Sequence, residues 1–293
     1  MANKTIDIKW APELTQEQYN FMQTPLMVKM LGTVDDNGWP HITFIANNRA
    51  CSKTQVVFGE FMYGKSKQYI QARPKHAYMF MGLSLPFTLL QIKADFSHIA
   101  NKGEDIDQFN VSQDMRYSTT MNVFRVFYSN IKEVSPMKKI SLLKVLGAGI
   151  SNGITRGSLK RDTQKETFNR FGKLIFNSVM NPKFLVYIDP KDGYPVILPC
   201  FQAFPPDNTQ LAFRMNQFED QLNQIPVGSK IAIYGLTMEF IAQEASGTYL
   251  GAEKIRGYMM GRMDIEQIYN SGPPMPGKIY PEIEVLPEIT EFE

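Results

Sequence analysis

Two stretches of the chain place apolar, β-branched and aromatic residues on either side of an acidic turn that contains glycine. The first is "LGTVDDNGWPHI", residues 31–42, and the second is "LVYIDPKDGYPVI", residues 185–197. Each turn, Asn37-Gly38 or Asp192-Gly193, precedes an aromatic residue, a proline and a second apolar run. This pattern is typical of β-hairpins and predicts one in each half of the chain.

The likeness between the two halves continues beyond the hairpins. Gly38 and Gly193 are 155 residues apart, and so are Phe58 and Phe213. At that offset, nine of the 44 ungapped positions from residue 38 to residue 81 are identical. Chance pairing at about one in twenty would give only about two or three identities. We therefore predict an internal repeat of two β-domains that share one design.

The segment between the two β-domains has a helical pattern. Its apolar residues recur at spacings of three and four, as in Phe168, Phe171, Leu174, Ile175 and Val179. Glycines at 147, 149, 153 and 157 predict a break in the middle of it. The predicted boundaries are 20–137 for the first domain, 138–181 for the helical linker, 182–270 for the second domain and 271–293 for a proline-rich acidic tail. The tail is expected to be an extended arm or disordered.

Composition and charge narrow the classes of protein to consider. The 293 residues are 43% hydrophobic and 20% charged, a normal globular balance, with a formal net charge of +2. That charge gives no reason to expect binding to nucleic acid or to a membrane surface. Two cysteines, no signal-peptide pattern and no apolar run long enough to span a bilayer indicate a soluble cytoplasmic protein with free thiols.

The stretch "GEFMYGKSKQYIQARP", residues 59–74, concentrates positive charge directly after an apolar run that reads as a strand. Lys65 and Lys67 flank Ser66, and these charged and hydroxyl donors suit a phosphate dianion. A helix that starts near Ser66 would add free N–H groups and its dipole, and Gly64 allows a close approach. The alternative is that these residues simply begin a solvent-exposed helix.

The order of these features resembles the FMN-binding split β-barrels of the pyridoxamine 5′-phosphate oxidase-like superfamily. The resemblance rests on "MLGTVDDNGWPHITFI", then "TQVVFGEFMYGKSKQYIQARPKHAYMF", then "LLQIKADFSHI". It covers about 110 residues of the first half and recurs more faintly in the second. It implies a mainly β fold with helices (α+β), with two split barrels in tandem, the second degenerate.

The resemblance also implies FMN as the cofactor and a set of residues that would hold it. Lys65, Ser66 and Lys67 would bind the phosphate, with Arg49 contributing from the preceding strand. The ring system would lie against the backbone of Gly59, Glu60 and Phe61, and Gln91 would reach the ring from a later strand. Many members carry a small hydroxyl residue where this chain has Glu60 or Phe61, so the register of the ring contacts stays open.

The second repeat differs at the phosphate-binding position. Lys65, Ser66 and Lys67 align with Asp220, Gln221 and Leu222, which replaces two positive charges by one negative charge and one neutral group. We therefore expect one flavin per chain. Members of this superfamily usually form homodimers, and a tandem chain could instead build a pseudo-dimer internally; both arrangements stay open.

The resulting hypothesis is an FMN-dependent oxidoreductase that acts with a small-molecule substrate or electron donor, with no catalytic acid or base assigned. The alternative is a non-catalytic module that binds or stores flavin, haem or another anionic ligand. His41, His76 and His98 lack metal-ligand spacing, so no metal site is predicted. His76 or His98 could serve as an axial haem ligand, although a surface or packed histidine is the simpler interpretation.

Overall fold

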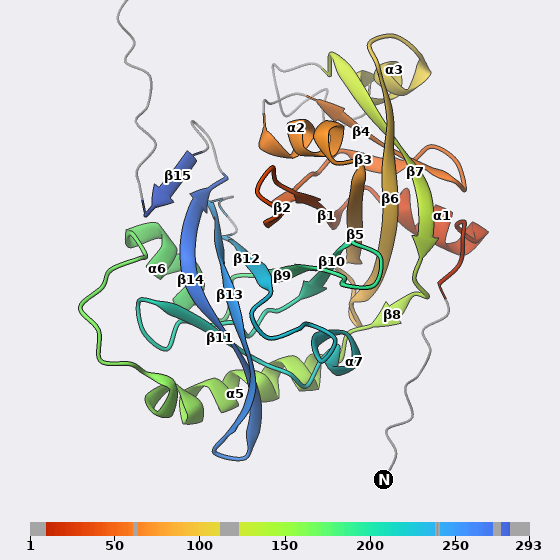
Figure 1. Cartoon of the computed structure of the whole chain (residues 1–293). Coiled ribbons are helices and arrows are strands. Elements are labelled where there is room, and N and C mark those ends of the chain that lie inside the picture. The colour runs from red at the N-terminus through yellow and green to blue at the C-terminus, as the bar shows by residue number, and fades with distance from the viewer. Residues whose placement is uncertain are drawn as a thin grey trace, which may run out of the picture. The chain divides into compact units, whose positions relative to one another are not determined.

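The computed structural model of the chain describes residues 10–60, 64–111, 123–237, 239, 241–271 and 277–281. Two antiparallel sheets form most of this part of the chain, and short helices connect or cover their strands (Figure 1). The predicted fold class, mainly β with helices, is confirmed.

The first sheet has the strand order β2-β1-β5-β6-β7-β4-β3, and β8 pairs with β6. Its strands are β1 (Met27–Val34), β2 (Pro40–Phe44), β3 (Asn48–Ala50), β4 (Gln55–Glu60), β5 (Lys75–Gly82), β6 (Thr88–Ala100), β7 (Arg125–Val134) and β8 (Lys138–Lys139). The predicted hairpin joins β1 to β2, with Val34 opposite Pro40. Its turn residue Gly38 has φ of +79°, a left-handed conformation that glycine adopts without strain.

The hydrophobic core of the first sheet shows that the sheet curls. Leu31 of β1 and Ala50 of the edge strand β3 belong to one buried cluster together with Phe58, Tyr78 and Phe127. Strands from opposite ends of the sheet can share a core only if the sheet wraps around it, as in a half-barrel. The Phe58 and Phe127 rings stack with their centroids 5.0 Å apart. Each such buried side chain contributes about 1.5–3 kcal/mol to folding.

Three helices accompany the first sheet: α1 (Gln16–Met22), α2 (Lys65–Ala72) and α3 (Glu104–Val111). Helix α1 begins with a capping box in which Thr15 and Gln18 satisfy each other's backbone N–H groups. Helix α2 lies at one end of the sheet, packed on β1 and β2 (Figure 1). Ile70 anchors α2 in the core, and Tyr69 meets the His41 ring edge-on at 5.5 Å.

The second sheet has the strand order β10-β9-β12-β13-β14-β11, and β15 pairs with β14. Its strands are β9 (Lys183–Ile188), β10 (Pro195–Pro199), β11 (Gln210–Arg214), β12 (Lys230–Leu236), β13 (Ala242–Ile255), β14 (Tyr258–Asn270) and β15 (Gly277–Tyr280). Taken in chain order, these strands follow the same sequence of neighbours as β2-β1-β5-β6-β7-β4 in the first sheet. The turn between β9 and β10 again uses a left-handed glycine, Gly193, with φ of +78°.

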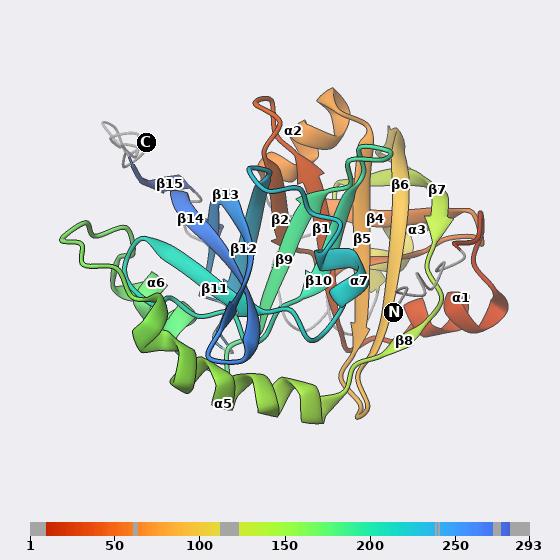
Figure 2. The ribbon, with the colours of Figure 1, turned by 60° about the horizontal axis from the view of Figure 1, so that its bottom comes forward.

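The linker is helical, but its helices differ from the predicted ones. Helix α5 (Leu142–Leu159) runs through all four glycines without interruption, so the predicted break is wrong (Figure 2). Glycine lowers helix stability without ending a helix, and the chain leaves the helical conformation only at Lys160. In α6 (Arg170–Asn177), Ile175 and Phe176 are buried, whereas Leu174 is largely exposed. The apolar spacing therefore located this helix but not its buried face.

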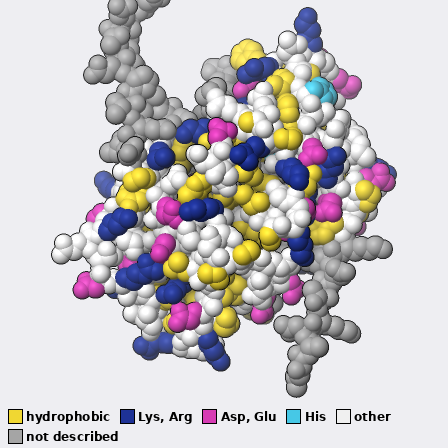
Figure 3. Space-filling model, in the orientation of Figure 1, with side chains coloured by type: hydrophobic (Ala, Val, Ile, Leu, Met, Phe, Trp, Pro, Cys, Tyr) yellow, Lys and Arg dark blue, Asp and Glu magenta, His cyan; other side chains and the backbone are white. Residues whose placement is uncertain are grey.

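The chain divides into two compact units that are not contiguous in sequence. The first comprises Met1–Lys144, Val186–Leu198 and Asp220–Gln224, and the second comprises Val145–Leu185, Pro199–Glu219 and Ile225–Glu293. The first unit thus contains the β9–β10 turn and α7 (Glu219–Leu222) from residue 220 onward. No helix within the described ranges is both long and apolar enough to cross a bilayer. On the face shown in Figure 3, positive and negative side chains are interspersed.

Candidate functional site

The start of α2 forms a basic corner at the end of β4. The helix begins at Lys65, next to the start near Ser66 that the sequence analysis considered, and Gly64 is its N-cap in an extended conformation. Gly64 itself has no side chain that could cap the first turn. A Cβ built on Gly64 would have no atom within 4 Å, which leaves the backbone open to close approach.

Four of the predicted residues, Glu60, Lys65, Ser66 and Lys67, meet at this corner. Ser66 is buried, with 5% of its surface exposed. The Lys67 ammonium lies 3.2 Å from a carboxylate oxygen of Glu60, and Arg125 of β7 donates to the other oxygen of Glu60 at 2.6 Å. Lys65 lies in the same turn, so these described side chains, three positive and one negative, together carry a net charge of +2.

The charges at the corner alter each other's ionisation. Burial opposes ionisation of Glu60, but the hydrogen bond from Arg125 and the charge of Lys67 outweigh it, so the pKa of Glu60 lies below its ordinary value. Burial lowers the pKa of Lys67, and the Glu60 carboxylate offsets part of that effect. Glu60 is therefore a firmly ionised carboxylate that neutralises part of the surrounding positive charge.

The structure describes only part of the segment that was predicted to contact the flavin ring. Phe61 lies outside the described residues. At Gly59, an added Cβ would lie 2.7 Å from the Asn47 amide nitrogen and 2.8 Å from Val123. Asn47 also donates a hydrogen bond of 2.8 Å to the Gly59 carbonyl oxygen. Glycine is thus needed at this position because two side chains occupy the space beside its Cα.

Arg49 lies on the opposite face of the sheet from Glu60. Arg49 pairs with Val57 of β4, and Val57 packs in a cluster with Phe109 of α3. Glu60 lies two residues after Phe58, which belongs to the core inside the curled sheet. Because successive side chains of a strand point to opposite faces, Val57 and Glu60 lie on opposite faces, and Arg49 lies on the face of Val57. The Arg49 guanidinium forms an ion pair with Asp105 and lies 5.2 Å from the centre of the Phe109 ring. The structure therefore joins Arg49 to α3 rather than to the corner.

Gln91 lies on the outer face of β6, where its side-chain amide is already hydrogen-bonded. It donates to the Ile197 carbonyl oxygen at 2.7 Å and accepts from Gln221 at 3.2 Å. Gln221 is the residue that aligns with Ser66, so the second repeat's counterpart of the corner contacts the first barrel. Its helix α7 has four residues, and Asp220 brings a negative charge, which makes it a poor phosphate site.

The sequence analysis did not predict a buried ion cluster that lies close to Gln91. The Lys93 ammonium, 7% exposed, forms ion pairs with Asp192 and with Glu133 at 3.1 Å, and Asp189 lies at 3.6 Å. Lys75 donates to the Asp192 carbonyl oxygen at 2.6 Å. Asp192 is 99 residues from Lys93 and 117 residues from Lys75, so no local pattern indicated these contacts. The alternation of polar and apolar residues along β6, with Gln91, Lys93 and Asp95 on one face, was the local pattern that could have indicated a polar contact on that face.

The histidines and cysteines lie in different environments. His76 is fully buried and hydrogen-bonded to the Pro74 carbonyl oxygen and the Ser129 hydroxyl, whereas His98 is exposed and stacked on Tyr128. Cys51 and Cys200 are free thiols. In the described part of the chain, no group of three or more histidine, cysteine, aspartate or glutamate side chains could hold a metal ion.

Comparisons with known proteins found similarity at the level of solved structures. No family model matches the chain, and no curated protein matches it. An FMN-binding protein from Syntrophomonas wolfei is 12% identical, with 42% of this chain and 84% of that chain covered at a TM-score of 0.36. A candidate pyridoxamine 5′-phosphate oxidase from Lactobacillus delbrueckii is 20% identical, covering 42% and 94% at 0.33. A FAD-binding protein from Mesorhizobium loti is 15% identical, covering 44% and 97% at 0.30.

Proposed function

We propose that this chain is an FMN-binding protein of the oxidoreductase class and that the corner at the start of α2 holds the phosphate of the flavin. The observation that carries the proposal is the donor set of this corner. Lys65, Ser66 and Lys67 occupy the first turn of α2, directly after its N-cap residue Gly64. Charged and hydroxyl donors at a helix N-terminus are the groups that bind phosphate in proteins.

The charge of the corner favours FMN over FAD. FMN ends in a phosphate monoester, which carries up to two negative charges on one phosphorus, whereas the diphosphate of FAD carries one negative charge on each of its two phosphorus atoms. Lys65, Lys67 and Arg125 minus Glu60 leave a net charge of +2, which matches the monoester dianion. Glu60 offsets one of the three positive charges.

The flavin, when bound, would supply electron or hydride transfer. The chain's own residues would bind its phosphate and orient it, and none of them is assigned as an acid or base. The counterpart of the corner in the second repeat carries Asp220 and Gln221, so we propose one flavin per chain. A chain that stores flavin without reacting is the second candidate, because Gln91, the residue expected to reach the ring, is engaged by Ile197 and Gln221.

The proposal is tested by comparing FMN with riboflavin, which lacks the phosphate. Flavin fluorescence quenching would give both affinities for the wild type, for a Ser66→Ala/Lys67→Glu double variant and for Lys102→Glu, a control that reverses the charge of an exposed lysine. The double variant should lose at least 100-fold in FMN affinity and change riboflavin affinity less than twofold, with Lys102→Glu equal to the wild type. Equal FMN affinity in the wild type and the double variant would refute the placement. Bleaching of bound flavin by a nicotinamide donor would then distinguish an enzyme from a store.

A further inference from the structure

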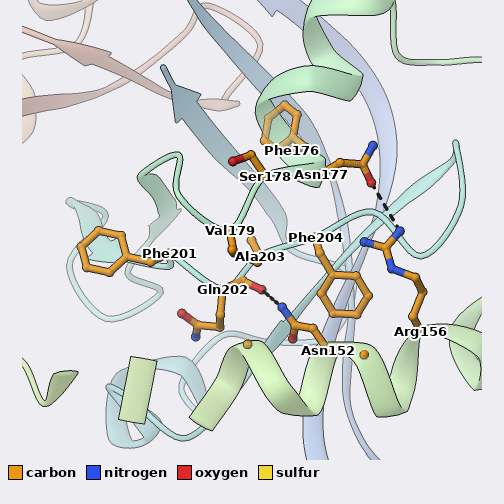
Figure 4. A pocket seen from close by; sticks show the side chains of 12 residues that line it. Asn152, Arg156, Phe176, Asn177, Ser178, Val179, Phe201, Gln202, Ala203 and Phe204 are labelled. Carbon is orange, nitrogen blue, oxygen red and sulfur yellow. Dashed lines mark hydrogen bonds between the residues drawn. The ribbon is translucent and has the colours of Figure 1, made fainter. Parts of the chain in front are cut away.

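The second compact unit contains a half-open cavity of about 160 Å³, and polar side chains at this cavity already have protein partners (Figure 4). Asn152 donates to the Gln202 carbonyl oxygen at 2.7 Å, and Arg156 donates to the Asn177 side-chain oxygen at 3.3 Å. The cavity itself therefore indicates no ligand. The features that indicate a binding partner lie elsewhere, at one end of the first sheet.

Four leucines are exposed at this end of the sheet, all within the first compact unit. Leu26 precedes β1, Leu83 and Leu85 belong to the turn between β5 and β6, and Leu143 lies in the first turn of α5. Each of them exposes between 46% and 81% of its surface. One exposed leucine is ordinary, but several that lie together mark a surface that binds a protein or a membrane.

The strand pairing brings three of these leucines together. Met27 pairs with Gly82, so Leu26 and Leu83 lie next to each other just beyond the last pair of β1 and β5. Leu85 lies in the middle of the turn, which extends past the ends of β5 and β6 (Figure 2). The leucines therefore form the tip of this end of the sheet.

The other side of the turn carries the fourth leucine and two positive charges. The Ile140 N–H donates to the Phe87 carbonyl oxygen at 2.8 Å, three residues before Leu143. Strand β8 consists of Lys138 and Lys139, which pair with the first two residues of β6. The lysines thus lie at the base of the turn, set back from its tip.

Positive charge predominates at this end of the sheet. Lys139 is exposed and Lys138 is half-buried. Burial lowers the pKa of Lys138, and the charge of Asp220 offsets part of that effect. With Asp220 counted against the two lysines, the local net charge is +1. Three segments that form this end of the sheet contain neither aspartate nor glutamate: residues 18–34, 75–94 and 134–144. The net charge of the whole chain conceals this local distribution.

We propose that this end of the first sheet binds the surface of a membrane that contains anionic lipids. The leucines would enter the boundary between headgroups and acyl chains, and Lys138 and Lys139 would lie at the level of the lipid phosphates. Leu85 is three residues from Thr88, the partner of Lys139, so the tip extends at most about 10 Å beyond that lysine along the strand. Apolar faces of interfacial segments enter a membrane by about 5–10 Å, which matches this spacing.

The size and charge of the surface favour lipid over a protein partner. A stable protein interface buries about 800 Å² on each partner and uses about 20–30 residues on each side. A projecting turn with four leucines and two lysines offers far less contact area to a rigid partner. A lipid surface instead adapts to the shape of the turn, and its anionic headgroups complement the lysines at the base.

Co-sedimentation with vesicles tests the proposal on the full chain. Vesicles of phosphatidylcholine with about 30% phosphatidylserine should bind the wild type roughly fivefold or more tightly than phosphatidylcholine alone, because the anionic lipid attracts the lysines. Raising the salt concentration from about 0.1 M to about 0.5 M should reduce this difference. Equal binding to both kinds of vesicle would overturn the anionic-lipid assignment, and binding to neither would overturn the whole proposal.

Variants assign vesicle binding to this end of the sheet. Leu83→Ser/Leu85→Ser should weaken binding to the anionic vesicles about tenfold or more, and Lys139→Glu should weaken it similarly without changing binding to phosphatidylcholine. Matched controls are Leu174→Ser, at an exposed leucine of α6, and Lys102→Glu, at an exposed lysine after β6. Both controls should bind like the wild type. Undiminished binding in the leucine variant would overturn the proposal.

Sedimentation velocity without vesicles distinguishes a lipid surface from a contact between two copies of the chain. The wild type and the Leu83→Ser/Leu85→Ser variant should have the same oligomeric state, and circular dichroism should show the same fold, because both leucines are exposed. A wild-type dimer that this variant dissociates would assign the leucines to an interface between two copies and overturn the proposal.

Discussion

The burial of His76 predicts how the free energy of unfolding changes at acidic pH. The ring lies on β5 with none of its surface exposed, between the Pro74 carbonyl oxygen at 2.7 Å and the Ser129 hydroxyl at 2.9 Å. The same hydroxyl contacts the Tyr78 hydroxyl at 2.9 Å. Burial lowers the pKa of His76 from 6.5 to about 4 because the charged ring would lose its hydration.

The direction of the change in stability depends on whether the folded or the unfolded chain binds a proton at His76. Between pH 4 and pH 6.5 the unfolded chain protonates His76 and the folded chain does not, so the free energy of unfolding falls as the pH falls. The full gap between the pKa values of 6.5 and about 4 corresponds to about 3 kcal/mol, since each pH unit is worth about 1.4 kcal/mol. Between pH 7.5 and pH 5, where carboxylates contribute less, the expected loss is about 2 kcal/mol.

Urea unfolding measured across this range would test the prediction. His76→Gln removes the titrating ring, so its free energy of unfolding, although lower overall, should vary with pH by about 2 kcal/mol less than that of the wild type. His98→Gln, a change at the exposed histidine, should keep the wild-type dependence. Identical pH dependence in His76→Gln and the wild type, or an NMR titration midpoint of His76 near 6.5, would refute the reasoning.

Two further predictions concern the corner and the second sheet. Glu60→Gln removes the carboxylate that lies 3.2 Å from the Lys67 ammonium, and with it the repulsion of the phosphate, so the affinity for FMN should rise roughly tenfold. Riboflavin is the control in the same titration, and a lower affinity for FMN would contradict the charge argument. Gly247→Ala should destabilise the chain by about 3 kcal/mol, because its Cβ would lie 1.7 Å from the backbone carbonyl oxygen of Asp264. Gly157→Ala, which meets no atom within 4 Å, should instead add about 0.5–1 kcal/mol in the same thermal unfolding assay.

Local sequence patterns predicted the turns and helices that are determined by residues close together in the sequence. The hairpin turns at Gly38 and Gly193 follow from the need for a left-handed residue, and the structure places both there. Helix α2 starts at Lys65, next to the start near Ser66 that the sequence analysis considered. The four glycines of α5 misled the prediction because helix propensity is a weak preference that the remaining turns of a long helix can override.

Contacts between distant parts of the chain could not be predicted in the same way. The sequence placed Arg49 near the corner, but the face of a β3 residue depends on its pairing with β4, and the structure turns Arg49 toward Asp105. The burial of Lys93 by Asp192 depends on the β9–β10 turn joining the first compact unit. Neither arrangement has a signature within a short window of sequence, because the partners are 56 and 99 residues apart.

The flavin content of the reconstituted protein is the most direct test of the central claim. The wild type and the Ser66→Ala/Lys67→Glu variant would be incubated with excess FMN, freed of unbound cofactor by gel filtration, and denatured to release what is bound. The account predicts about one FMN per wild-type chain and close to none in a variant that elutes as a folded protein. Two FMN per chain, or the same FMN content in both proteins, would contradict it.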